Sequence, residues 1–391
     1  MNRLLVLILG CLFIITLGFG PAGLALCMPT LAADLHLTYT QQGVLLSIGL
    51  WAFLVALLSA GVADRAGFRG LLVLSAIIQA SGWLLMGCAT NYAWLCAAAL
   101  VTGIGSALAD PLLTPMVCAV YPEQRARISN VLHAGYALGL VFTSMMAMAL
   151  LAAGANWRGI MQVLGLFCLP CGAAALVVRL PARAHQGHDR LPLRRALRQP
   201  LFWLLALAMA VAGGIEMAPT GWLPTLLQQR AGASGHPALA GGASMLLFGA
   251  LLGAGRLLTA FIERRLGLRR WLLTMALLCG AGFVVAVLPL GAAGAAIGLG
   301  AVGFGVACFW PSLLALGGDR FPTGGASMFT GLTVAGGLGA GTAPAVVGWI
   351  ADHTRGGLTT GLCLMALLPL VLFAVVARMT GAHEATDRDG K

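Results

Sequence analysis

Long apolar segments recur along the whole chain, and short polar segments separate them. The segments lack the alternation of apolar and polar positions that marks a barrel strand, and a helix needs roughly 20 apolar residues to cross a bilayer. Breaks at charges, at Pro and Gly and at polar clusters delimit twelve predicted spans: 4–28, 43–63, 70–89, 94–120, 130–153, 158–179, 201–226, 239–262, 270–289, 293–317, 325–350 and 359–379. The pattern predicts an all-α integral membrane protein with twelve transmembrane helices.

Composition and charge support a membrane protein over a soluble one. Hydrophobic residues make up 60% of the chain and charged residues only 9%, against about 25% charged residues in an average soluble domain. The net charge of +11 follows the topology: with the N-terminus in the cytoplasm, 20 of the 23 Lys and Arg residues, Arg256 among them, fall on the cytoplasmic side. Only Arg158, Arg230 and Arg355 fall outside. We therefore expect a multi-pass protein of a bacterial-type inner membrane with both termini cytoplasmic, surrounded by lipid and without a nucleic-acid partner.

A polar stretch at 181–199 divides the spans into two sets of six. The predicted units are an N-terminal bundle (1–180), a cytoplasmic linker (181–199), a C-terminal bundle (200–380) and a cytoplasmic tail (381–391). An offset of 200 positions superposes Gly67 on Gly267, Arg69 on Arg269, Gly103 on Gly303 and Pro111 on Pro311. Duplicated halves of this kind place a substrate site near the midplane and expose it alternately to each side of the membrane. The repeat therefore predicts two pseudo-symmetric six-helix bundles that work by alternating access.

The loop after the second span carries the most specific motif. It reads Asp64-Arg65-Ala66-Gly67-Phe68-Arg69, and a weaker copy runs from Arg264 to Arg270. This loop resembles the signature of the major facilitator superfamily, a family of secondary transporters. The resemblance implies a cytoplasmic gate formed by Asp64, Arg65, Gly67, Arg69, Arg265, Gly267 and Arg269, in which Asp64 faces the positive end of a neighbouring helix. The alternative is that these are only positive-inside charges beside a turn glycine.

The chain also departs from the pattern of that family. Ala60 and Gly70 replace a usual glycine and a common second base of the loop. Ala99 stands where many members carry an intramembrane arginine, and the fifth span lacks the Gly-Pro pair that marks drug antiporters. The missing Gly-Pro pair weighs against multidrug efflux.

Of the twelve acidic residues, only Asp110 and Glu216 lie well inside predicted spans. Ionisable groups in a membrane are costly and usually functional, and burial favours the protonated form of a carboxyl. A carboxyl that is protonated on one side and released on the other carries a proton. The family resemblance places both acids at the central cavity. The alternatives are a bend at Asp110-Pro111 and a structural tie at Glu216.

Two shorter motifs resemble the fucose-proton symporter and sodium-glucose branch of the superfamily. One is Gly214-Ile215-Glu216 with the Gly221-Trp222 and Pro224-Thr225 pairs that follow, and the other is the segment 130–139 with His133 and Tyr136. This resemblance implies a sugar-like solute coupled to protons or sodium, although His133 is equally consistent with a satisfied histidine at a helix start. The candidate site comprises Glu216, Asp110, His133 and Tyr136 for coupling or substrate binding, with Thr114, Trp222, Trp310 and Thr220 lining the cavity. Trp310 is the repeat mate of Asp110, and its ring suits stacking on a substrate or anchoring at the membrane interface.

The first hypothesis for function is proton-coupled symport of a small polar organic solute, and the alternative is proton-coupled efflux of a drug or metabolite. We expect neither a cofactor nor a metal, because the spans contain one histidine, His133, and no cluster of metal ligands or catalytic groups. The chain lacks the Gly-Lys-Ser/Thr run of a phosphate-binding loop. An enzyme is therefore not expected, and we expect the transporter to be a monomer.

Overall fold

The computed structural model describes residues 2–181, 197–231, 237–321 and 325–388, and within these ranges the chain is almost entirely helical. The helices are α1 (Arg3–Leu35), α2 (Tyr39–Trp51), α3 (Phe53–Gly87), α4 (Tyr92–Val120), η1 (Pro122–Gln124), α5 (Arg125–Ala152), α6 (Trp157–Val177), α8 (Pro200–Ala231), α9 (Pro237–Leu266), α10 (Leu268–Val287), α11 (Gly291–Val306), α12 (Phe309–Arg320), α13 (Gly325–His353), α14 (Gly357–Met365) and α15 (Leu367–Arg388). Most of the predicted linker lies outside the described residues, and α15 continues into the predicted tail.

Eleven helical segments among the described residues are long and apolar enough to cross a membrane. The remaining predicted span, 43–63, is also helical, but it breaks at Ala52 into α2 and the first part of α3. The tenth span is likewise formed by α11 and α12, and the twelfth by α14 and α15. Each predicted span therefore corresponds to one helical crossing, although three of them are interrupted.

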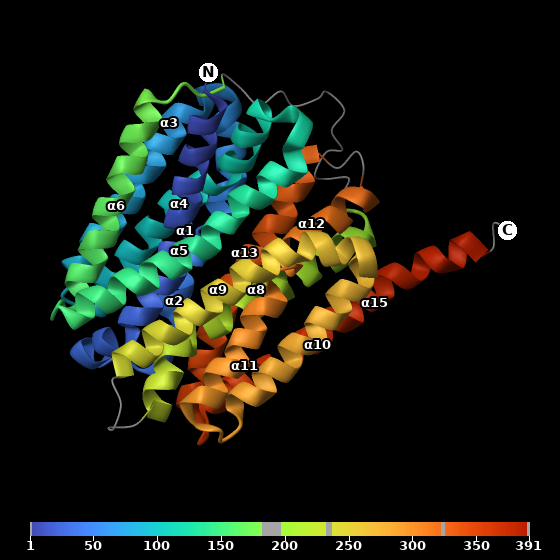
Figure 1. Cartoon of the computed structure of the whole chain (residues 1–391). Coiled ribbons are helices and arrows are strands. Elements are labelled where there is room, and N and C mark those ends of the chain that lie inside the picture. Colours follow the sequence, from blue (N-terminus) through green and yellow to red (C-terminus); the bar gives the residue numbers. More distant parts are fainter. Residues whose placement is uncertain (1, 182–196, 232–236, 322–324, 389–391) are drawn as a thin grey trace.

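The helices form two bundles (Figure 1). Helices α1 to α6 make the N-terminal bundle, in which α3 packs on α4 and α6 while α1 packs on α5. Helices α8 to α15 make the C-terminal bundle, where α8 packs on α13 and α10 on α11. The bundles meet where α2 lies along α13, α5 along α9 and α1 along α8. These three helix pairs surround the space between the bundles.

Large apolar side chains cover the outside of the molecule. Val177 is 79% exposed, Phe261 71% and Ile297 65%. Exposed apolar surface on this scale marks a protein that faces lipid. The fold therefore satisfies its backbone hydrogen bonds within helices and presents its apolar side chains to the bilayer.

The two glycines that the repeat superposes have the same unusual backbone. Gly67 has φ 75° and ψ 170° inside α3, and Gly267 has φ 80° and ψ 145° at the start of α10. Only glycine adopts this region without strain. Each residue reverses the chain between two spans, and the offset of 200 positions is therefore visible in the backbone.

Glycines also bring α8 and α13 together. The α-carbon of Gly213 faces the carbonyl oxygen of Gly336, and that of Gly339 faces the carbonyl oxygen of Ala210. A β-carbon at either glycine would collide with the opposing backbone. The two helices consequently approach more closely than larger residues would allow.

Candidate functional site: a central cavity

A cavity of about 670 Å³ lies between the two bundles. Helices α1 to α5 line it from one side, and α8, α9, α12 and α13 line it from the other. Toward one end of the molecule, here called the Tyr39 end, the lining of the cavity includes Leu45 and Pro344. It extends in the opposite direction, toward the Gly67 end, as far as Phe68 and Phe329. The cavity thus runs along the interface between the bundles.

An acid and a base from the C-terminal bundle face each other in this cavity. Glu216 is on α8, Arg256 is on α9, and 4.0 Å separates Oε1 of Glu216 from Nη2 of Arg256. Their side chains are only 8% and 13% exposed, respectively. A buried charge without a partner lowers the stability of a protein, so each of these two groups needs the other to compensate its charge. The pair is the strongest electrostatic feature of the cavity.

Arg256 also contacts the N-terminal bundle. Its Nη1 donates a hydrogen bond to the carbonyl oxygen of His133 at 2.7 Å, and its guanidinium carbon lies 5.3 Å from the centre of the Tyr136 ring. Both of these residues are on α5. The Arg256 Nε and the Tyr136 hydroxyl are buried and have no hydrogen-bond partner among the described residues. Two polar groups beside the cavity are therefore unsatisfied.

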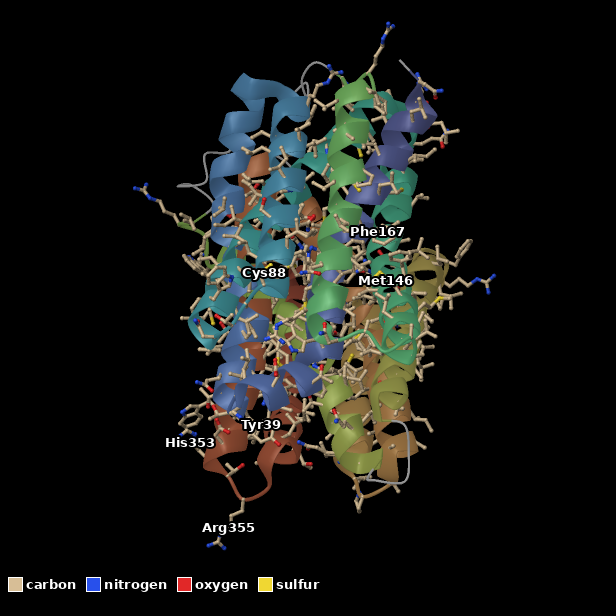
Figure 2. All side chains as sticks on the ribbon, turned by 90° about the vertical axis from the view of Figure 1, so that its left-hand side faces the viewer. Tyr39, Cys88, Met146, Phe167, His353 and Arg355 are labelled. Atoms are coloured by element: carbon tan, nitrogen blue, oxygen red, sulfur yellow. The ribbon has the colours of Figure 1, made fainter. Side chains whose placement is uncertain are left out.

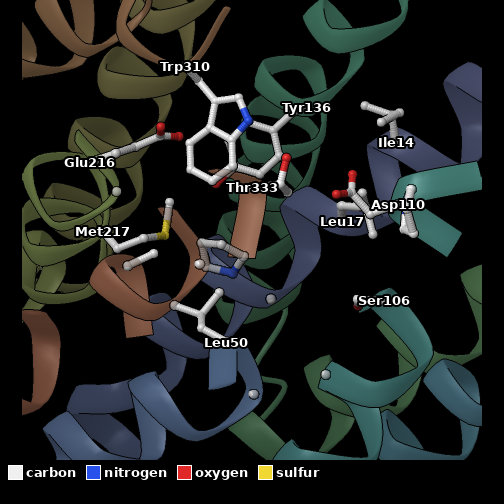
Figure 3. Close-up of a pocket in the computed structure, with 18 of the residues that line it drawn as sticks. Ile14, Leu17, Leu50, Ser106, Asp110, Tyr136, Glu216, Met217, Trp310 and Thr333 are labelled. Atoms are coloured by element: carbon white, nitrogen blue, oxygen red, sulfur yellow. The ribbon is translucent and has the colours of Figure 1, made fainter. Parts of the chain in front are cut away.

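The second predicted acid lies elsewhere in the cavity. Figure 3 shows Asp110 near Ile14 and Leu17, whereas Glu216 lies on the opposite side with Trp310, Tyr136 and Thr333. No hydrogen bond to the Asp110 side chain is present within the described part of the chain. The two acids therefore occupy separate positions in one cavity.

One polar contact joins α4 and α5 at this side. The hydroxyl of Thr114 lies 3.1 Å from Nε2 of His133, and both residues line the cavity. Which of the two atoms donates depends on the histidine tautomer. The His133 ring is thereby oriented by a neighbour, while its carbonyl holds Arg256.

The four predicted cavity-lining candidates divide into two groups. Trp310 lines the cavity, as Thr114 does, but Thr220 and Trp222 do not. The Thr220 hydroxyl donates to the carbonyl of Glu216 at 2.6 Å, and the Trp222 indole donates to the carbonyl of Pro344 at 3.0 Å. Both side chains are fully buried between helices in this structure, and a contact between either of them and a substrate stays a prediction.

The predicted gate residues gather at the Gly67 end. Arg69 donates to the carbonyl of Val178 at 3.0 Å, Arg265 is exposed and Arg269 is partly buried. The side chains of Asp64 and Arg65 lie outside the described residues. The turns at Gly67 and Gly267 are thus present, and both the gate and the interaction expected of Asp64 stay predictions.

Sequence reasoning missed Arg256. We counted it among the cytoplasmic charges, but the structure places it in the cavity beside Glu216. The sequence does contain a signal for it, because Arg256 is an ionisable residue inside the predicted span 239–262, and such residues are functional candidates whether acidic or basic.

The described residues contain no group of three or more metal-ligating side chains.

Two helical bundles that enclose a cavity with buried charges define a membrane carrier of the two-bundle type. A family model described as Major Facilitator Superfamily matches residues 8–344. The chain belongs to this family. It is a membrane transporter rather than an enzyme, and the predicted fold of twelve helices in two bundles is confirmed.

Known proteins that resemble the chain are transporters as well. The curated 2-nitroimidazole transporter of Escherichia coli (strain K12) is 30% identical over 291 residues, which are 72% of each chain. Among solved structures, a mutant of the nucleoside transporter NupG has a TM-score of 0.74 at 13% identity, covering 97% of this chain and 99% of its own. The transporter FucP in its outward conformation has a TM-score of 0.68 at 15% identity, covering 96% and 99%. A bacterial homologue of the human lysosomal transporter Spinster, inward-facing and occupied, has a TM-score of 0.69 at 17% identity, covering 96% and 94%.

Proposed function

We propose that the protein is a secondary transporter that moves a small organic solute together with protons by alternating access. The observation that carries this proposal is the buried pair of Glu216 and Arg256 in a cavity between two bundles. A carboxylate held by a guanidinium is a site where one proton changes the net charge of the cavity. Proton binding to Glu216 then frees Arg256 for the solute, so that proton and solute bind together.

The coupling follows from the hydrogen-bonding capacity of the pair. When Glu216 takes up a proton, its attraction for Arg256 is lost, and the guanidinium becomes available to an acceptor on the solute. The Tyr136 hydroxyl and the Arg256 Nε are further donors for that acceptor. When the solute leaves, Glu216 releases its proton and the ion pair forms again. Asp110, on the opposite side of the cavity, is a second candidate for proton uptake.

The substrate is proposed to be a small, moderately polar ring compound. Trp310 and Tyr136 supply aromatic faces, and aliphatic side chains line much of the remaining cavity. Such rings stack on a sugar or on a planar heterocycle. The relative described as a 2-nitroimidazole transporter favours the planar heterocycle.

The Gly67 end is proposed to face the cytoplasm of a bacterial-type inner membrane, with both termini on that side. The uneven distribution of Lys and Arg supports this orientation. The bundles would act as two rigid units, 1–180 and 200–380, joined by the linker 181–199. A monomer is sufficient for this mechanism, because one chain supplies all of the cavity.

Transport into proteoliposomes tests the proposal. The purified protein is reconstituted, and accumulation of radiolabelled 2-nitroimidazole and a panel of other ring compounds is measured under a pH gradient or a sodium gradient. We expect accumulation under the pH gradient and its loss in the combined Glu216→Gln and Asp110→Asn variant. Glu123→Gln is the matched control, because Glu123 is an exposed acid that pairs with Arg3 outside the cavity. Full gradient-driven transport by the combined variant would contradict the coupling role.

Efflux by proton antiport is the second candidate. The cavity reaches Phe329 at the Gly67 end, where a cytoplasmic solute would enter, and its aliphatic lining suits an apolar compound. Vesicles prepared in the two orientations, each given an inward and an outward pH gradient, separate the candidates. Symport predicts solute movement in the direction of the protons, and antiport predicts movement against it.

A further inference from the structure

One carboxylate joins the two bundles at the Tyr39 end. Oδ1 of Asp352, at the end of α13, accepts a hydrogen bond from the backbone N–H of Tyr39 at 3.0 Å, and Oδ2 accepts one from that of Thr40 at 2.7 Å. Tyr39 and Thr40 begin α2, which belongs to the opposite bundle. Figure 2 shows Tyr39 at the same end of the molecule as His353, the neighbour of Asp352.

The start of α2 explains why this contact exists. A helix leaves its first N–H groups without partners inside the helix. Thr38 and Gln41 form a capping box in which each side chain accepts the N–H of the other residue, at 3.3 and 3.0 Å. The N–H groups of Tyr39 and Thr40 remain, and Asp352 accepts both. Local sequence thus satisfies half of the helix start, and the opposite bundle satisfies the rest.

Neighbouring contacts close the same end. Gln229 donates to the Tyr39 hydroxyl at 2.6 Å, and the N–H of Ala345 donates to the hydroxyl of Ser47 at 3.1 Å. Ser47 is 1% exposed in this interface. Asp352 is the charged partner in this set of contacts, and it faces the positive end of the α2 dipole.

We propose that Asp352 is a latch that holds the Tyr39 end of the cavity closed. The carboxylate binds α2 while the bundles are in contact at this end, and both partners turn to water when the end opens. The loop signature implies a related contact at the Gly67 end, where Asp64 is expected to face the positive end of a neighbouring helix. Each end would then be held by one carboxylate and one helix terminus. The inference rests on the proposed alternating access, and it names the residue that favours the state closed at the Tyr39 end.

The labelling rate of a buried cysteine measures the opening of this end. Ser47→Cys is introduced into the full chain after the exposed Cys88 and Cys363 have been replaced by serine. The protein is placed in lipid nanodiscs, and its reaction with a water-soluble maleimide is followed by mass spectrometry. Because Ser47 is buried and does not line the cavity, labelling requires the interface between α2 and α13 to open. The rate is therefore proportional to the open population.

We expect Asp352→Ala to accelerate labelling of Cys at position 47 about fivefold, the effect typical of losing a helix-capping carboxylate. Asp34→Ala is the matched control, because Asp34 pairs with Arg158 inside one bundle, and its rate should stay within about twofold of the parent. Cys279 is fully buried and reports on general unfolding. An unchanged rate in Asp352→Ala, or an acceleration accompanied by labelling of Cys279, would overturn the proposal.

A second pair of variants removes the donor instead of the acceptor. Tyr39 is the first residue of α2, a position that tolerates proline, and Thr38 before it is already extended. Tyr39→Pro removes the ring and the N–H, whereas Tyr39→Ala removes the ring alone. We expect faster labelling in the proline variant, and equal rates would contradict the latch. The assay contains no solute and no proton gradient, so a failure of the proposed coupling would leave its outcome unaffected.

Discussion

The free energy that couples Glu216 and Arg256 can be measured by a double-mutant cycle. Glu216→Gln keeps the shape of the acid and removes its charge, and Arg256→Met replaces the guanidinium with an apolar chain. At the observed 4.0 Å, two unit charges attract by about 4 kcal/mol at an effective dielectric constant of about 20. Removing one partner of a buried pair typically costs about 3–5 kcal/mol, because the other charge is left alone. The double variant loses the attraction only once. We therefore expect its loss in free energy of unfolding to be about 3 kcal/mol smaller than the sum of the losses in the two single variants.

Equilibrium unfolding in mixed detergent micelles gives the free energy of unfolding of the four proteins. The matched control is the cycle of Arg3→Met and Glu123→Gln, whose atoms are closer, at 2.9 Å, but whose side chains are 57% and 50% exposed. Exposed pairs contribute about 0–1 kcal/mol, so the control cycle should show a coupling below about 1 kcal/mol. Additive effects at Glu216 and Arg256, within about 0.5 kcal/mol, would refute the reasoning that burial makes this pair interdependent.

Three further expectations concern the turn, the aromatic residues and an unsatisfied hydroxyl. Gly267→Ala should lower the free energy of unfolding by about 1–3 kcal/mol. The cause is the positive φ alone, because the space around Gly267 is empty and a methyl group would meet no atom there. Gly70→Ala, on an open helical surface, is the control and should be neutral or stabilising in the same unfolding assay. Trp310→Ala should raise the KM for transport, whereas Trp222→Phe should leave KM unchanged and lower the free energy of unfolding by about 1–3 kcal/mol, because the Pro344 carbonyl loses its donor. Tyr136→Phe should leave the solute-free protein as stable as the parent, since the hydroxyl has no partner among the described residues, and weaken solute binding measured by calorimetry. A loss of stability in Tyr136→Phe would show that the hydroxyl has a structural partner.

The sequence predicts the fold well because its dominant signal is local. About 20 apolar residues in a row specify a membrane helix without reference to any other part of the chain. The predicted span 43–63 marks the limit of this signal. Its helix is interrupted at Ala52, where no proline or glycine in the sequence indicates an interruption. The repeated glycines, Gly67 and Gly267, were predictable for a different reason, since their backbone conformation nearly requires that residue.

The candidate site was predictable only in part because it depends on which side of a helix faces which neighbour. Charge inside a span identified Asp110 and Glu216, and both line the cavity. The same criterion passed over Arg256, because its position near one end of a span fitted the rule for cytoplasmic charges equally well. Trp222 shows the opposite difficulty: it follows Glu216 by six residues, and this spacing alone does not reveal that its indole faces α13.

The glycine contacts between α8 and α13 bear on how sequence variation in this protein should be interpreted. Gly213 and Gly339 each press against a backbone carbonyl of the opposite helix, and neither belongs to the ion pair that we propose for coupling. Any side chain there would force the helices apart, so both positions should be as intolerant of substitution as Glu216 itself. A survey of tolerated substitutions would find few at the residues that pack the helices and few at those that carry out transport, and would not distinguish the two groups. Only a measurement that separates the amount of folded protein from its transport rate would tell the two apart.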